Sequence, residues 1–185
     1  DRAELRERIE RESDRVVQHY LLLQYFATLA PSEADSLLAQ RILAEVPPSS
    51  HTWSLLWGGP AQCIFSICRL ANRPDAARAY NLRAADQHPD EAVRAAFLFH
   101  EVQRAFAAMK KERSALANPE TAATTTAEMD FSILYGRLQT EFAGSRAAQM
   151  ANAQMGPERR IQPGNRVPDF AVTSLEDSSV SFTPE

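Results

Sequence analysis

The residues best suited to chemistry in this 185-residue sequence are two cysteines and a histidine–glutamate pair. Cys63 and Cys68 are separated by four residues, whereas redox-active cysteine pairs are separated by two. His100 and Glu101 begin like the zinc-binding helix of metalloproteases, but Arg104 occupies the position of the second histidine. We therefore expect no catalytic residues in this chain. The apolar surroundings of the two cysteines predict that both are buried as small apolar side chains.

The remaining motifs that could hold a ligand are also missing from the sequence. Its four histidines are scattered and match no spacing of zinc ligands; they are His19, His51, His88 and His100. The sequence contains no glycine-rich loop that could cradle a phosphate and no Gly-x-Ser-x-Gly nucleophile motif. It therefore predicts neither a metal site nor a bound cofactor.

Composition and charge exclude further classes of protein. A hydrophobic content of 44% and a charged content of 24% are ordinary for a globular protein and argue against wholesale disorder. The net charge of −4 argues against non-specific binding to nucleic acid, which requires a basic face. No apolar run approaches the roughly 18–20 residues of a membrane span, so we expect no membrane span in this chain.

Prolines and glycines divide residues 1–155 into a series of expected helices. The charged segment 1–15 shares one helical face with the apolar residues from Val16 onward, which predicts a single helix that ends at Pro31. A coiled-coil interpretation of this helix is not favoured, because its heptad pattern does not persist. Further helices are expected over 32–46, 50–57, 61–70, 76–87, 91–112, 127–142 and 146–155.

Two of these helices carry further expectations about burial. The segment 61–70 is nearly all apolar, so we expect it to be the most buried helix. Trp53 and Trp57 follow Ser50, which is predicted to cap their short helix. These tryptophans could line a ligand pocket or wedge helices together, and the second interpretation is favoured because large aromatic side chains commonly supply core area.

The end of the sequence, residues 160–182, has a different pattern from everything before it. A proline–glycine turn at 163–164 and Pro168 exclude a continuous helix. Two short runs with alternating apolar residues follow at 169–174 and 179–182, separated by a polar turn. The sequence therefore predicts a short C-terminal β-hairpin or an extended tail behind a mainly α protein.

This end of the chain resembles the opening segment of the peroxiredoxin and TlpA-like thiol–disulfide oxidoreductase families, which share the thioredoxin fold. The residues that carry the resemblance are a glycine turn, a Pro-Asp-Phe triplet and strand positions: Gly164, Pro168, Asp169, Phe170, Val172, Leu175 and Val180. In these families the cysteine motif lies downstream of this segment. The resemblance implies a helical domain over 1–155, a linker over 156–168 and the first strands of a truncated redox domain over 169–185.

A second resemblance concerns residues 135–151, which are similar to part of a tetratricopeptide-type (TPR) repeat. It rests on Tyr135-Gly136-Arg137-Leu138, then Glu141-Phe142-Ala143-Gly144-Ser145, then Ala147, Ala148 and Ala151. The proline usual after the phenylalanine is Ala143 here, and no regular period of about 34 residues runs through the chain. We therefore expect a TPR-like domain of antiparallel helical hairpins rather than a repeat array.

The resemblances leave two functional hypotheses. In the first, this is the helical partner-binding or scaffolding domain of a thiol–disulfide oxidoreductase or peroxiredoxin-like antioxidant protein, whose catalytic part follows and without which the fragment is inactive. Its partner would be another protein or its own redox domain, with a homodimer through the tail as a further option. The resemblance suggests a periplasmic or other extracytoplasmic location. In the second, it is a free-standing helical interaction module with no enzymatic role.

The cysteine spacing yields a first prediction. Five residues of continuous helix rise about 7.5 Å, which places the two Cα atoms beyond the roughly 7 Å limit of an unstrained disulfide. Mass spectrometry of the non-reduced chain should find free thiols at both Cys63 and Cys68. An intact bridge between them would show that the helix is interrupted there.

Overall fold

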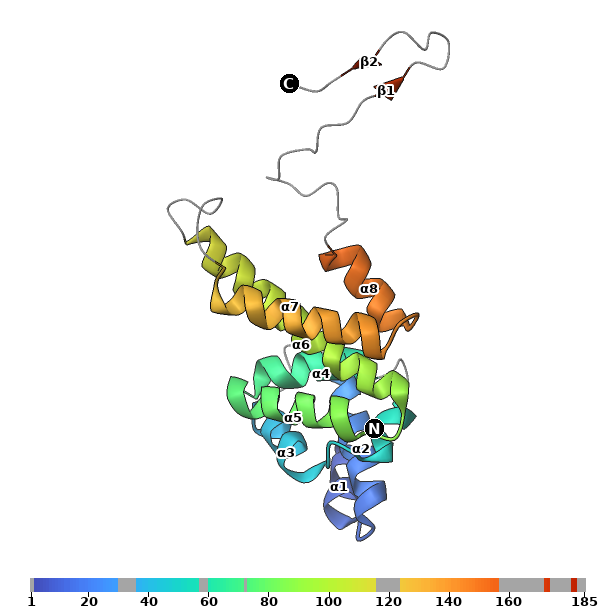
Figure 1. The fold of residues 1–185 in the computed structure, drawn as a ribbon. Coiled ribbons are helices and arrows are strands. Elements are labelled where there is room, and N and C mark those ends of the chain that lie inside the picture. Colours follow the sequence, from blue (N-terminus) through green and yellow to red (C-terminus); the bar gives the residue numbers. More distant parts are fainter. Residues whose placement is uncertain are drawn as a thin grey trace.

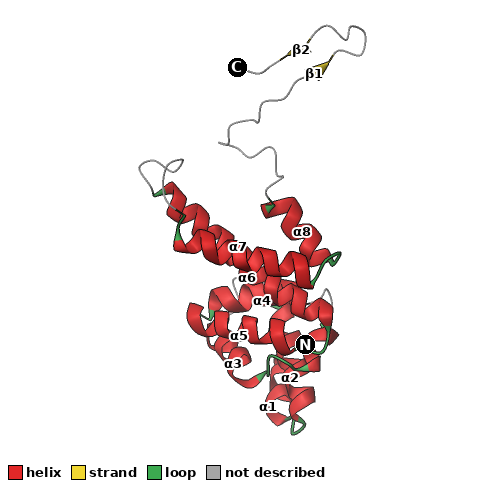
Figure 2. Cartoon of the chain, viewed as in Figure 1, coloured by secondary structure: helices red, strands yellow, loops and turns green. Residues whose placement is uncertain are grey.

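The computed structural model describes residues 2–29, 36–56, 60–71, 73–115, 124–156, 172–173 and 181–182. This described part is mainly helical, as the sequence predicts (Figures 1 and 2). Its helices are α1 (Arg2–Arg11), α2 (Arg15–Thr28), α3 (Ser36–Glu45), the 3₁₀ helix η1 (His51–Leu55), α4 (Pro60–Leu70), α5 (Pro74–Gln87), α6 (Glu91–Ser114), α7 (Thr126–Glu141) and α8 (Arg146–Met155).

The long helix α6 lies at the centre of this arrangement and contacts α4, α5, α7 and α8 (Figure 1). Its start is fixed by Asp90, whose carboxylate accepts hydrogen bonds from the backbone N–H groups of Ala92 and Val93. Its buried residues, among them Phe97 and Leu98, lie on more than one face.

The prediction that residues 61–70 form the most buried helix is wrong. In α4, which covers that segment, Phe65 is 52% exposed and Arg69 is exposed. Among the residues of this helix whose burial is described, the buried ones are Cys63, Ile64 and Ile67, which lie on one side of it. Apolar content alone did not reveal this, because the position of a helix in the fold decides how many of its faces are covered.

The single helix predicted up to Pro31 is also wrong, because the chain breaks at residues 12–14 into α1 and α2. Asp14 caps α2 by accepting a hydrogen bond of 2.8 Å from the N–H of Val16. Val16, which the helical pattern placed on the apolar face, is 61% exposed. A side chain that accepts hydrogen bonds from free backbone N–H groups can start a new helix and so compete with a continuous one. Here Asp14 starts α2, and the chain is interrupted before it.

Later helix boundaries agree closely with the sequence. The break at His88-Pro89-Asp90 separates α5 from α6, and α8 has the predicted bounds. Gly144, in the break between α7 and α8, has a φ of 82°, a left-handed conformation that glycine adopts without strain. Ser145 then caps α8 by accepting a hydrogen bond of 3.1 Å from Ala148.

Contacts near the helix ends show that α6 and α7 run antiparallel. Arg113, in the last turn of α6, forms an ion pair of 3.1 Å with Glu128, in the first turn of α7. At the other end, the guanidinium of Arg94 lies 5.4 Å from the ring centre of Phe142. The first turn of α6 therefore meets the end of α7, and the last turn of α6 meets its beginning.

An aromatic cluster joins η1, α5 and α6 inside the molecule. The ring of Trp53 meets Phe97 edge-on at 5.0 Å and Tyr80 at 6.2 Å. The Tyr80 hydroxyl donates to the carbonyl of Val46 at 2.7 Å and accepts from the indole N–H of Trp53 at 3.1 Å. Burial raises the pKa of Tyr80, so this hydroxyl stays protonated. Trp53 is therefore a core residue as expected, while Trp57 lies outside the described residues.

Two short strands are described near the end of the chain, β1 (Val172–Thr173) and β2 (Ser181–Phe182). They pair antiparallel, with Val172 opposite Phe182 and Thr173 opposite Ser181. The other residues of the predicted hairpin and the linker from 157 onward lie outside the described residues. So do four residues of the segment that resembles the redox families, which we call the opening motif: Gly164, Pro168, Asp169 and Phe170. The hairpin as a whole stays a prediction.

The Tyr80 hydroxyl provides a test of the aromatic cluster. Tyr80→Phe leaves the carbonyl of Val46 and the indole N–H of Trp53 buried without this partner, so it should lower the free energy of unfolding by about 1–3 kcal/mol. Tyr20→Phe, on a half-buried side chain of α2, should change it by less than about 0.5 kcal/mol. Urea unfolding measures both variants. Equal effects would mean that the hydroxyl contacts contribute no stability.

Candidate functional site

A carboxylate buried in the middle of α6 is the most unusual polar group of the described structure. Glu101 is 1% exposed. One of its oxygens accepts a hydrogen bond of 2.6 Å from the amide of Asn81 on α5, and the other accepts one of 2.7 Å from the Nε of Arg104. A buried charge is costly unless it is paired and hydrogen-bonded. Both oxygens of Glu101 meet this requirement.

The contacts of Glu101 continue into a polar network that joins four helices. Arg104 also reaches Asp130 of α7 at 3.4 Å, and Asp130 forms a second ion pair of 2.6 Å with Arg78 of α5. On the other side, the amide of Asn81 lies 3.3 Å from the sulfur of Cys68 on α4. We call Cys68, Asn81, Glu101, Arg104, Asp130 and Arg78 the polar network. It links α4, α5, α6 and α7 through side chains.

The two thiols are poorly suited to redox chemistry. Cys63 and Cys68 are both free. Burial raises the pKa of each thiol to about 11, and in Cys68 the hydrogen bond from Asn81 opposes that effect only in part. Because the thiolate is the reactive species, both side chains are nearly unreactive at neutral pH. Cys63 is buried as predicted, whereas Cys68 is half-buried and belongs to the polar network.

His100 lies beside this network but does not extend it. Burial lowers the pKa of His100, so its imidazole is neutral at pH 7. Its ring meets the ring of Phe65 edge-on at 5.8 Å, and its Nδ1 has no hydrogen-bond partner among the described residues. Within that part of the chain, no group of three or more His, Cys, Asp or Glu side chains is arranged to hold a metal ion.

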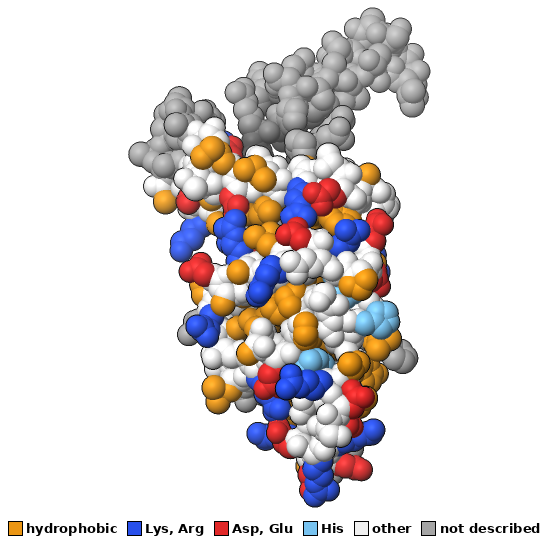
Figure 3. Space-filling view, turned by 60° about the horizontal axis from the view of Figure 1, so that its bottom comes forward, with side chains coloured by type: hydrophobic (Ala, Val, Ile, Leu, Met, Phe, Trp, Pro, Cys, Tyr) orange, Lys and Arg blue, Asp and Glu red, His pale blue; other side chains and the backbone are white. Residues whose placement is uncertain are grey.

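A hollow of about 300 Å³ adjoins the polar network between α4, α5 and α6. We call it the α4–α6 groove. Its lining includes small or flat apolar side chains, those of Phe65, Pro74, Ala77 and Ala107. Three guanidinium groups, those of Arg69, Arg78 and Arg104, also line it. Apolar surface with a few polar groups beside it is typical of binding sites. Figure 3 shows apolar patches among basic and acidic side chains on one face of the molecule.

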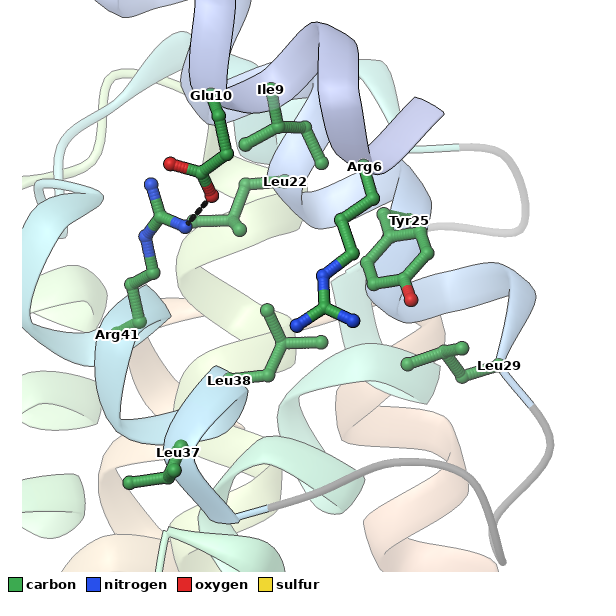
Figure 4. A pocket seen from close by; sticks show the side chains of 9 residues that line it. All are labelled: Arg6, Ile9, Glu10, Leu22, Tyr25, Leu29, Leu37, Leu38 and Arg41. Carbon is green, nitrogen blue, oxygen red and sulfur yellow. Dashed lines mark hydrogen bonds and ion pairs between the residues drawn. The ribbon is translucent and has the colours of Figure 1, made fainter. Parts of the chain in front are cut away.

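A second hollow, of about 310 Å³, lies between α1, α2 and α3 (Figure 4). Glu10 and Arg41 face each other across one side of it and form an ion pair of 2.5 Å. Leu29 and Leu37 also line this hollow. Along the chain, segment 30–35 lies between these two leucines and is outside the described residues.

Sequence spacing did not reveal the polar network, although it singled out some members. Cys68 and Glu101 belong to sequence patterns that do not complete a motif, and Arg104 is the residue that replaces the second histidine of one of them. One signal could have indicated the network, because Glu101 lies next to His100 on the apolar side of its helix with an arginine three residues later. Its other partners come from different helices.

Comparisons with known proteins do not extend this description. No family model matches the chain, and comparisons with curated proteins and with solved structures also gave no match. Among the described helices, none is both long enough and apolar enough to cross a membrane. Of the residues that carry the redox resemblance, only Val172 is described, in β1, and the opening motif itself lies outside the described residues.

The polar network makes a quantitative prediction about stability. Arg104→Ala leaves one oxygen of the buried Glu101 without its charged partner, so it should lower the free energy of unfolding by about 2–4 kcal/mol. Arg113→Ala removes an exposed ion pair from the same helix and should cost less than about 1 kcal/mol. Chemical denaturation of the two variants measures the difference. Similar losses would show that Glu101 does not depend on Arg104.

Proposed function

We propose that the helical part of this chain is a partner-binding domain that precedes a thioredoxin-fold redox domain. The observation that carries this proposal is the α4–α6 groove, an apolar hollow that opens at the surface and is lined by three helices. The half-exposed ring of Phe65 forms part of its wall. Exposed apolar surface rimmed by polar groups is typical of interaction sites, whereas the described residues offer no reactive thiol.

The helices that follow the groove support a TPR-like construction. Helices α5, α6 and α7 follow one another with α6 antiparallel to α7, and α8 returns onto α6. Ala148 and Ala151 are buried on α8, where small side chains allow close helix packing. Gly136 departs from the pattern, because the space around its missing Cβ is open and no close approach requires glycine there.

The redox part of the proposal rests on the opening motif formed by Gly164, Pro168, Asp169 and Phe170. It assigns thiol–disulfide exchange or peroxide reduction to the domain that these residues would begin, and not to Cys63 or Cys68. The helical domain would then hold a protein partner, or its own redox domain, in place for that chemistry. A pairing of two copies through β1 and β2 and an extracytoplasmic location belong to the same proposal.

Activity assays test the division between binding and chemistry. The 185-residue chain should show only background turnover in insulin-reduction and peroxidase assays, because both thiols are held in the unreactive form. The chain extended by the residues that follow Glu185 in its gene should be active. That activity should survive the double change Cys63→Ser and Cys68→Ser and disappear when the first downstream cysteine becomes serine.

Two results would contradict the redox proposal. Robust activity of the 185-residue chain that is lost on Cys63→Ser would place the chemistry in the helical part. A gene without any cysteine downstream of Glu185 would leave the free-standing interaction module, in which the same groove binds a partner without a redox role.

A further inference from the structure

The shape of the α4–α6 groove limits what can enter it. Ala77 and Ala107 line the groove with methyl groups, so the space between their helices is not filled from within. Phe65 closes one wall, where its ring is held edge-on against His100 at 5.8 Å. Since burial lowers the pKa of His100, this wall carries no charge at neutral pH. The groove therefore favours an apolar side chain as its occupant.

The charges around the groove determine which charged group on the occupant would bind there. Two of the three lining arginines already have carboxylate partners, because Arg78 is held by Asp130 and Arg104 by both Glu101 and Asp130. The charges of these two arginines and two carboxylates add up to zero. Arg69 is exposed and has no ion-pair partner among the described residues, so it leaves one positive charge at the rim of the groove.

Guanidinium chemistry adds to this preference for an anion. Each guanidinium has five N–H donors in a planar fork that matches a carboxylate. The ion pairs within the polar network use only some of the donors of Arg78 and Arg104. The Arg69 side chain donates no hydrogen bond to any residue in the described ranges. The protein as a whole carries a net charge of −4. The positive rim is therefore a local feature and not a property of the entire surface.

We propose that the α4–α6 groove binds an acidic peptide segment, which places one apolar side chain between Phe65, Ala77 and Ala107 and a neighbouring carboxylate on Arg69. The proposal rests on the partner-binding half of the proposed function and is independent of the redox half. It names a protein segment as the ligand because the groove is lined by the faces of three helices and opens at the surface. A peptide can lie along such a surface while one of its side chains enters.

Fluorescence anisotropy with the whole 185-residue chain tests the proposal. The probe is a short peptide with a neutral dye and one phenylalanine flanked by aspartates, and it should bind saturably. Replacing the aspartates with lysine, or the phenylalanine with alanine, should each weaken binding by about tenfold or more, because a charged pair or a buried ring is lost. Free phenylpropanoate should not displace the peptide at comparable concentrations, since it lacks the peptide's other contacts.

Matched protein variants locate the binding site. Arg69→Glu reverses the unpaired rim charge and should weaken binding of the aspartate peptide by about tenfold or more. Ala107→Trp fills the groove from an exposed position of α6 without a change of charge, and it should weaken binding as strongly. Arg83→Glu makes the same charge change at an exposed site of α5 that does not line the groove, and it should stay within about twofold of the unchanged protein. Circular dichroism confirms that each variant is folded.

Several outcomes would overturn the proposal. They are the absence of saturable binding to the unchanged protein, equal binding of the lysine and aspartate peptides, and equal effects of Arg69→Glu and Arg83→Glu. Full displacement by phenylpropanoate at similar concentrations would instead identify a small aryl carboxylate as the ligand. None of these outcomes changes the result of the activity assays, so a failure here is distinguishable from a failure of the redox proposal.

Discussion

The buried carboxylate of Glu101 is the constraint on which the arrangement of α5, α6 and α7 depends. Apolar contacts have little directional preference, so helices with mainly apolar faces could slide along one another at modest cost. Hydrogen bonds need defined distances and angles. Asn81 must therefore lie opposite Glu101, which fixes where α5 sits on α6. Arg104, which is bonded to Glu101, also pairs with Asp130 and so fixes where α7 lies on α6. The α4–α6 groove lies beside these contacts, so its shape depends on them as well.

The first half of the chain is held by contacts of a different kind. Trp53, Tyr80 and Phe97 form an aromatic cluster in which the hydroxyl and the indole N–H are both hydrogen-bonded. A histidine adds a second link, since the Nδ1 of His88 accepts from the N–H of Asp90 at 3.0 Å and its Nε2 lies 3.0 Å from the carbonyl of Ser50. The Nε2 can therefore donate a hydrogen bond to this carbonyl. These contacts attach the segment before α4 to α5, α6 and the turn between them.

The sequence predicted local features of the fold better than long-range ones. The turn at His88-Pro89-Asp90 and the bounds of α8 followed from prolines, caps and glycine, which act within a few residues. The break at Asp14 was missed because an apolar pattern runs through it. The central place of α6 was missed because burial depends on what other segments cover. The polar network combines residues from four helices that are far apart in the sequence, and no spacing rule within one segment could bring them together. The redox resemblance is predicted from sequence alone, because all four residues of the opening motif lie outside the described structure.

The length of α6 has a consequence for how the described helices lose their structure. Twenty-four residues of α-helix extend about 36 Å, and the first part of α6 packs in the aromatic cluster while its end pairs with α7. Repeat arrays unfold unit by unit, because each unit contacts only its neighbours. Here one helix contributes buried surface to both halves, so neither half can melt while the other keeps its core. The described helices should therefore unfold as a single cooperative unit, with the slowest amide exchange along the middle of α6.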